Sequence, residues 1–171
     1  TTTDYDDEEK KRKISINTAV AYGEWKKQKI NLIDMPGFAD FLADTKIALS
    51  VVDTAVVLVC GVAGVEVTTD KTWGFAADYH LPRFIFINKL DRARARFDRA
   101  LESIQSSFGH NVIPVQIPIG QEASFQGVVD LIRQKAYIYK DASGKYTETA
   151  IPADLADQVA EYREKLVEKA A

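Results

Sequence analysis

The chain has 171 residues, of which 46% are hydrophobic and 27% charged, a composition typical of a globular domain with its own core. A net charge of −3 excludes a general electrostatic attraction to nucleic acid, so RNA binding would need a local patch, and no direct DNA binding is expected. The single cysteine, Cys60, excludes an internal disulfide and fits a reducing compartment. No apolar stretch approaches the roughly 18 residues of a membrane span, so no membrane partner is expected.

The N-terminal part combines a charged head with a predicted hairpin. Residues 1–13, TTTDYDDEEKKRK, have the composition of a solvated, mobile tail. Apolar and polar residues then alternate from Ile14 to Val20, a turn region follows near Lys26, and Ile30–Ile33 runs apolar. This pattern predicts a β-hairpin whose second strand is buried.

The middle of the chain alternates short apolar runs with helical periodicity. Continuous apolar runs are typical of strands buried on both faces, and strands that alternate with helices indicate a parallel α/β sheet. We therefore predict an α/β fold, a mostly parallel sheet with helices on both faces. The expected strands after the hairpin are Thr54–Cys60, Arg83–Ile87 and Val112–Ile117, and the expected helices lie at 41–52, Val65–Tyr79 and Ala95–Phe108.

A smaller lobe is expected to follow. After Gly120 the pattern changes to short strands joined by a turn at 141–144, and then to an amphipathic helix that begins near Leu155. We interpret residues 1–110 as one domain and residues 111–171 as the start of a small α+β lobe.

Asn88-Lys89-Leu90-Asp91 directly follows an expected strand. A carboxylate such as that of Asp91 can accept hydrogen bonds from both the ring N–H and the exocyclic amine of guanine, an edge that adenine lacks. Asn88 can bind the base N7, and the methylenes of Lys89 can cover the base plane. The alternative is an ordinary surface loop.

Asp34-Met35-Pro36-Gly37 directly follows the strand Ile30–Ile33. A carboxylate at a strand end beside a phosphate can hold Mg²⁺ through a water, and a glycine lets its N–H approach a terminal phosphate. An Asp before a turn commonly caps the next helix instead. Because carboxyl ends of parallel strands share one edge of a sheet, we expect this turn and Asn88–Asp91 to serve one nucleotide site.

Together, Asp34–Gly37 and Asn88–Asp91 resemble the nucleotide-binding motifs of translational GTPases. Gly64–Arg92 is similar to bacterial elongation factor G, and Ile117–Tyr139 is similar to the start of the insert found in that factor and its near relatives. RKISI, Arg12–Ile16, resembles the end of switch I. The charged head is most similar to the elongation factor G-like paralogue group. The resemblance implies GTP or GDP and Mg²⁺ as ligands, and a cytoplasmic protein that acts on the ribosome.

The same resemblance assigns roles to the head and to the last helix. Residues 1–16 correspond to switch I, which is mobile without GTP and ordered by the γ-phosphate and Mg²⁺. Ser15 stands where the family has a threonine whose hydroxyl binds Mg²⁺, and Lys13 stands where it usually has glycine. The helix 155–170 corresponds to a docking surface for the ribosomal stalk protein, although a plain packing role is equally open.

Phe38 departs from the family, which has histidine directly after D-x-P-G, near the attacking water. Phenylalanine neither donates nor accepts a hydrogen bond, so we expect slow hydrolysis or another route. Two hypotheses stay open: a GTPase segment that acts on the ribosome, and a module that binds nucleotide or ribosome with little turnover. An unrelated doubly wound domain is a remote third.

The phosphate loop G-x-x-x-x-G-K-[ST] does not occur in the 171 residues, nor does the strand that precedes it. We therefore interpret the chain as the middle of a G domain and expect the isolated chain to bind GTP weakly or not at all. The strands Ile30–Ile33 and Thr54–Cys60 would flank the missing strand, so we expect a rearranged sheet or strand exchange.

Overall fold

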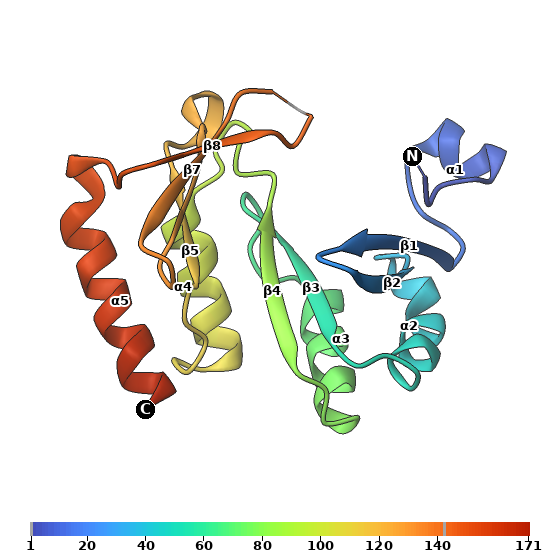
Figure 1. The fold of residues 1–171 in the computed structure, drawn as a ribbon. Helices are drawn as coiled ribbons and strands as arrows, with labels where there is room; N and C mark the ends of the chain where they lie inside the picture. The colour runs from blue at the N-terminus through green and yellow to red at the C-terminus, as the bar shows by residue number, and fades with distance from the viewer. Residues whose placement is uncertain (1, 142) are drawn as a thin grey trace. The chain divides into compact units, whose positions relative to one another are not determined.

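A computed structural model describes residues 2–141 and 143–171 (Figure 1). The chain divides into two compact units: unit 1 contains the chain up to Val57 and Glu66–Ile85, and unit 2 contains Leu58–Val65 and Phe86–Ala171. In chain order the helices and strands are α1 (Asp7–Arg12), β1 (Ala19–Trp25), β2 (Gln28–Asp34), α2 (Leu42–Leu49), β3 (Ala55–Cys60), α3 (Val67–Asp78), β4 (Arg83–Asn88), α4 (Phe97–Phe108), β5 (Gln116–Ile119), β6 (Gly127–Asp130), β7 (Lys135–Tyr139), β8 (Tyr146–Thr149) and α5 (Ala156–Ala170).

The predicted hairpin is confirmed as the antiparallel pair β1–β2, whose register runs from Ala19 opposite Asp34 to Trp25 opposite Gln28. Lys26 and Lys27 connect the strands with φ of 48° and 64°. Two positive φ angles give the kind of two-residue turn whose twist matches that of the strands.

The prediction that the second strand of the hairpin is buried is wrong in this structure. The side chains of Ile30 and Leu32 are 44% and 56% exposed. The physical reason is that β1 and β2 form a sheet of their own among the described strands, and a two-stranded ribbon buries little surface.

β3 and β4 form the parallel pair that the alternation of strands and helices predicted. The amide of Ala55 donates to the carbonyl of Pro82 at 3.0 Å, and that of Gly61 donates to the carbonyl of Asn88 at 2.8 Å. Both strands therefore run in the same direction. The predicted mostly parallel sheet contains only β3 and β4 within the described residues. β2 and β3, the strands expected to flank the absent strand, belong to separate sheets.

Each of these parallel strands alternates in burial, which corrects the expectation of strands covered on both faces. Val57 and Val59 are buried, whereas Val56 and Leu58 are 58% and 61% exposed. In unit 1 the start of β3 packs with α2 and α3 through Leu49, Ala55 and Ala76, with Val52, Phe75 and Leu81 against them. Helices thus cover one face of this short sheet.

Unit 2 contains an antiparallel sheet of four strands in the order β5-β6-β7-β8. The strand predicted at Val112–Ile117 begins at Gln116 and pairs antiparallel with β6, so its assignment to the parallel sheet was wrong. One face of the sheet packs against α5, which lies along it in Figure 1. The buried members of this core are Ile117, Ile119, Val129, Leu131, Ala136 and Val159.

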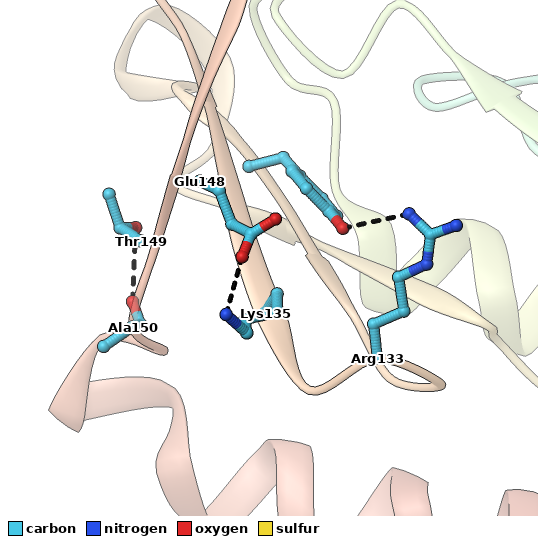
Figure 2. A network of polar contacts seen from close by, with 6 residues as sticks. Arg133, Lys135, Glu148, Thr149 and Ala150 are labelled. Carbon is cyan, nitrogen blue, oxygen red and sulfur yellow. Dashed lines mark hydrogen bonds and ion pairs between the residues drawn. The ribbon is translucent and has the colours of Figure 1, made fainter.

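Polar contacts tie the edges of unit 2 together (Figure 2). The Lys135 ammonium lies 2.6 Å from the Glu148 carboxylate across β7 and β8, and Arg133 donates to the Tyr137 hydroxyl at 3.2 Å. Arg163 of α5 donates to the carbonyl of Leu131 at 2.7 Å, which anchors the helix to the turn after β6.

No helix in the described part of the chain has the length and apolar character needed to cross a membrane.

Replacing Leu131 with Ala should destabilise the chain by about 2–5 kcal/mol, because the side chain is fully buried and its removal leaves a cavity. Ile132→Ala is the matched control, since the neighbouring side chain is 61% exposed and should cost less than about 0.5 kcal/mol. Urea unfolding followed by circular dichroism measures both values. Equal losses for the two variants would contradict the packing described for unit 2.

Candidate functional site

The Asp34–Phe38 segment leaves β2 directly, since Asp34 is the last residue of that strand. Pro36 is buried and pins the turn, while Gly37 is exposed. A Cβ added at Gly37 would meet no atom within 4 Å, so packing within the chain does not explain the glycine. The open space beside its backbone is what an incoming phosphate oxygen would require.

The alternative role for Asp34, capping the next helix, finds no support. The 3-10 turn Ala39–Phe41 and the helix α2 both begin without a side-chain cap. Phe38 starts that turn with its ring 52% exposed, and its carbonyl accepts from the amide of Phe41 at 3.0 Å. The aromatic ring therefore lies at the surface beside the turn rather than in a core.

Asn88 ends β4 and shapes the turn that follows. Its Oδ1 accepts from the amide of Lys89 at 2.8 Å, and its carbonyl accepts from Gly61 at 2.8 Å. Lys89 has φ of 62°, in the left-handed region that non-glycine residues adopt at a cost of about 1–2 kcal/mol. Lys89 and Asp91 are both exposed, so neither side chain is used in the core.

The Asn88–Asp91 turn is braced by residues that the sequence did not single out. The amide of Glu122 donates to the carbonyl of Leu90 at 3.0 Å, and the Glu122 carboxylate accepts from the amide of Arg94 at 3.0 Å. A Cβ at Gly61 would lie 2.9 Å from Leu90 Cδ2 and 3.2 Å from the Asn88 carbonyl oxygen, so the glycine allows the backbone to approach this turn closely. Glu122 and Gly61 lie far from the motif in sequence, and no local signal could have identified them.

Ser15 lies just before β1 and is partly buried. Its hydroxyl donates to the Asp4 carboxylate at 2.8 Å. A hydroxyl that donates its hydrogen to a carboxylate keeps its oxygen lone pairs for a cation. Ser15 and Asp34 supply only oxygen ligands, the type that Mg²⁺ prefers, and a short protein ligand set fits an ion that keeps several waters. Within the described residues no cluster of three or more His, Cys, Asp or Glu side chains could hold a metal.

The charged head is helical rather than a featureless tail. Asp6 begins α1 and accepts from the amide of Glu8 at 2.8 Å, while the Glu9 carboxylate reaches back to the amide of Asp6 at 3.0 Å. Acidic residues occupy the first turn and basic residues the last, an order that favours the helix dipole. The capping bonds and the order of charges therefore favour this helix.

Lys13 ends α1 with φ of 56° and ψ of 41°, a left-handed conformation. Its amide donates to the carbonyl of Glu9, as in the turns that glycine usually makes at helix ends. The lysine thus keeps the geometry that the resemblance associates with glycine at this position.

The predicted site residues fall into two groups. Ser15, Asp34, Met35, Pro36 and Gly37 belong to unit 1, and Asn88, Lys89 and Asp91 belong to unit 2. Each group follows the end of an element: Asp34 is the last residue of β2 and Asn88 the last residue of β4. Sequence reasoning also missed Glu9, which is fully buried and takes part in the head of unit 1.

Comparison with known proteins identifies one matching family and two similar proteins. The elongation factor Tu GTP binding domain family matches residues 1–168. Elongation factor G of Granulibacter bethesdensis is 44% identical over 99% of this chain. The crystal structure of a protein from Thermus thermophilus superposes on 98% of the chain with a TM-score of 0.89 at 32% identity. The chain spans 25% of the length of each of these two relatives.

Lys13→Gly should stabilise the end of α1 by up to about 1 kcal/mol, because glycine adopts the left-handed conformation without the clash of a Cβ. The matched control is Lys11→Gly within α1, which should destabilise the helix by about 0.5–1 kcal/mol. Amide hydrogen exchange of residues 7–17 measures both effects. Faster exchange in Lys13→Gly than in the unsubstituted chain would contradict the left-handed assignment.

Proposed function

The chain belongs to the family of elongation factor Tu GTP-binding domains, and on this premise we propose that it is the GTP-binding segment of an elongation factor G-like protein that acts on the ribosome in protein synthesis. The observation that carries the proposal is a pair of polar turns, Asp34–Gly37 and Asn88–Asp91, each beginning at the last residue of a strand. In parallel α/β sheets ligands bind beyond the carboxyl ends of the strands, as Asn88–Asp91 lies beyond β4 of the parallel pair.

Asn88–Asp91 is proposed as the guanine site. The Oδ1 of Asn88 accepts a hydrogen bond from the amide of Lys89. Its NH₂ group therefore remains to donate to the base N7. The exposed Asp91 carboxylate accepts from the two N–H groups on the guanine edge, and the Lys89 methylenes cover the ring. Selection of guanine over adenine then follows from hydrogen-bond polarity alone.

Asp34–Gly37 and Ser15 are proposed as the phosphate and Mg²⁺ side of the site. Asp34 would hold the ion through a water, the Ser15 hydroxyl would be its direct protein ligand, and the Gly37 N–H would face the terminal phosphate in the open space beside its Cα. Met35 and the buried Pro36 set the path of the turn. When bound, Mg²⁺ neutralises charge on the phosphates.

The two candidate functions, a GTPase and a binding module, differ in whether the protein hydrolyses GTP. Phe38 supplies no hydrogen-bonding group to a water, so the chain's own residues give no obvious way to orient the nucleophile. The second candidate is therefore a module that binds nucleotide and ribosome with little turnover, and the exposed Phe38 ring favours it.

The proposal also assigns a role to each part of the chain. Residues 1–110 are proposed to carry the GTP-binding motifs and residues 111–171 to belong to the insert lobe, whose helix α5 is proposed to meet the ribosomal stalk protein. The proposed compartment is the cytoplasm, where the ribosome and GTP are available. Because the chain spans a quarter of its relatives, tests of activity use a full-length protein that carries this segment.

Asp91→Asn should weaken GTP binding at least about 100-fold and improve binding of xanthosine triphosphate. Xanthine has a carbonyl where guanine has its exocyclic amine, so an amide matches it and a carboxylate does not. The control is Asp98→Asn, the same change at an exposed position on α4, which should alter neither affinity. Competition binding with a fluorescent nucleotide measures both. Unchanged GTP affinity in Asp91→Asn would exclude Asp91 as the guanine reader.

Phe38→His should raise ribosome-stimulated GTP hydrolysis by about 10²–10⁴-fold if the protein binds GTP and lacks only a group that orients water. Phe38→Gln is a useful second variant, since it adds a polar group without a titratable ring. Phosphate release at saturating GTP measures the rate. Rapid hydrolysis by the unsubstituted protein would reject the low-turnover module and support the GTPase.

A further inference from the structure

Glu9 is the one charged side chain fully enclosed among residues 2–141 and 143–171, and the proposed chemistry makes no use of it. It lies on α1, in the N-terminal part of the chain coloured dark blue in Figure 1. None of the ion pairs of the described residues includes it. A buried carboxylate without a cationic partner has to be satisfied by hydrogen bonds.

Three backbone amides provide that satisfaction. Glu9 Oε2 accepts from the amide of Asp6 at 3.0 Å, and Oε1 accepts from the amides of Ile16 and Asn17 at 2.9 and 2.8 Å. These bonds, that of Asn17 foremost, lower the pKa of Glu9 against the opposing effects of burial and of the Asp4 charge. The carboxylate therefore remains ionised where it is enclosed.

The geometry of these bonds points at Ser15. The amide of Ile16 belongs to the peptide bond that joins Ser15 to Ile16, so Glu9 fixes the plane of the peptide on the C-terminal side of Ser15. On the N-terminal side, the Glu9 carbonyl accepts from the amides of Lys13 and Ile14, the latter at 3.3 Å. One residue thus holds the backbone both before and after the proposed magnesium ligand.

We propose that Glu9 is a positioning residue that stabilises the ordered conformation of the Ser15 backbone by clamping the peptides that follow Ser15. The proposal rests on the assignment of Ser15 to the nucleotide site. The three hydrogen bonds lower the free-energy cost of ordering this segment when GTP and Mg²⁺ bind, so less of the binding energy is lost. The Glu9 carboxylate accepts hydrogen bonds from three backbone amides and is not itself proposed to bind the metal.

Amide hydrogen exchange of a full-length protein that carries this segment, with GTP and Mg²⁺ bound, tests the clamp itself. Glu9→Gln should raise the exchange rates of Ile16 and Asn17 at least about tenfold, because a neutral amide oxygen accepts more weakly than a carboxylate and the NH₂ end of the side chain faces another donor, the amide of Asp6. Glu8→Gln is the matched control, since Glu8 is exposed and pairs with Arg12 at 2.9 Å, and it should leave both rates unchanged. Equal protection in Glu9→Gln and the unsubstituted chain would overturn the proposal.

The Mg²⁺ concentration that half-saturates GTP binding, measured in a full-length protein with this segment, tests the positioning role. Glu9→Gln should raise it about tenfold, whereas Glu8→Gln should not. Adding Glu9→Gln to Ser15→Ala should change it little further, because both substitutions remove the same contact. A fully additive effect would show that Glu9 acts elsewhere and would reject the role.

These measurements separate the failure of this proposal from that of the proposed function. If Ser15→Ala weakens Mg²⁺ binding and Glu9→Gln does not, the role of Glu9 is wrong and the nucleotide site stands. If the unsubstituted protein binds no GTP, both are wrong. Glu9→Asp serves where Glu9→Gln fails to fold: it keeps the charge, but a side chain shorter by one methylene should not span Asp6 and Asn17 at once, so the shifts should have the same direction.

Discussion

A backbone amide that leaves a strand or a helix needs a new acceptor, and this requirement organises the loops on which the proposed function depends. The chain answers it with side chains at the ends of its elements. Glu9 receives the amides before β1, and Asn88 receives the first amide after β4. The same solution recurs in unit 2, where Ser103 accepts from Val65, Glu122 from Arg94, and Asp130 from Ile132 and Arg133.

This arrangement divides the polar residues into two kinds. Some, such as Asn88 and Glu9, accept hydrogen bonds from backbone amides and so determine the course of a turn. Others, such as Lys89 and Asp91, stay exposed on a turn that is already held. A ligand that meets such a turn does not have to order it, so less of its binding energy is lost.

The sheets show how far pattern reading reaches. Alternation and apolar runs located the hairpin, the parallel pair β3–β4 and the helices α3 and α4 to within a few residues. These patterns did not predict burial correctly, because an apolar run such as Arg83–Ile87 has the same sequence pattern whether one face of the strand or both are covered. In the structure Phe84 and Phe86 are 58% and 57% exposed. The patterns also assigned the strand near Ile117 to the wrong sheet, because a short apolar strand carries no signal of its partner.

By itself, the sequence determined the order of the elements from the hairpin onward and the two polar turns, because turn residues and hydrophobic periodicity act between near neighbours in the chain. The motif residues Asp34, Gly37, Asn88 and Asp91 could be named for the same reason. The prediction of a mobile tail at residues 1–13 was wrong for α1, because the capping residues of this helix were not recognised. Only the tertiary structure decided that Glu9 is buried on the amides of Ile16 and Asn17, and that Glu122 and Gly61 brace the turn after β4. The contacts of Glu122 and Gly61 join residues distant in sequence, and those of Glu9 reach seven and eight residues along the chain, beyond the end of α1. Packing rather than local propensity selects them.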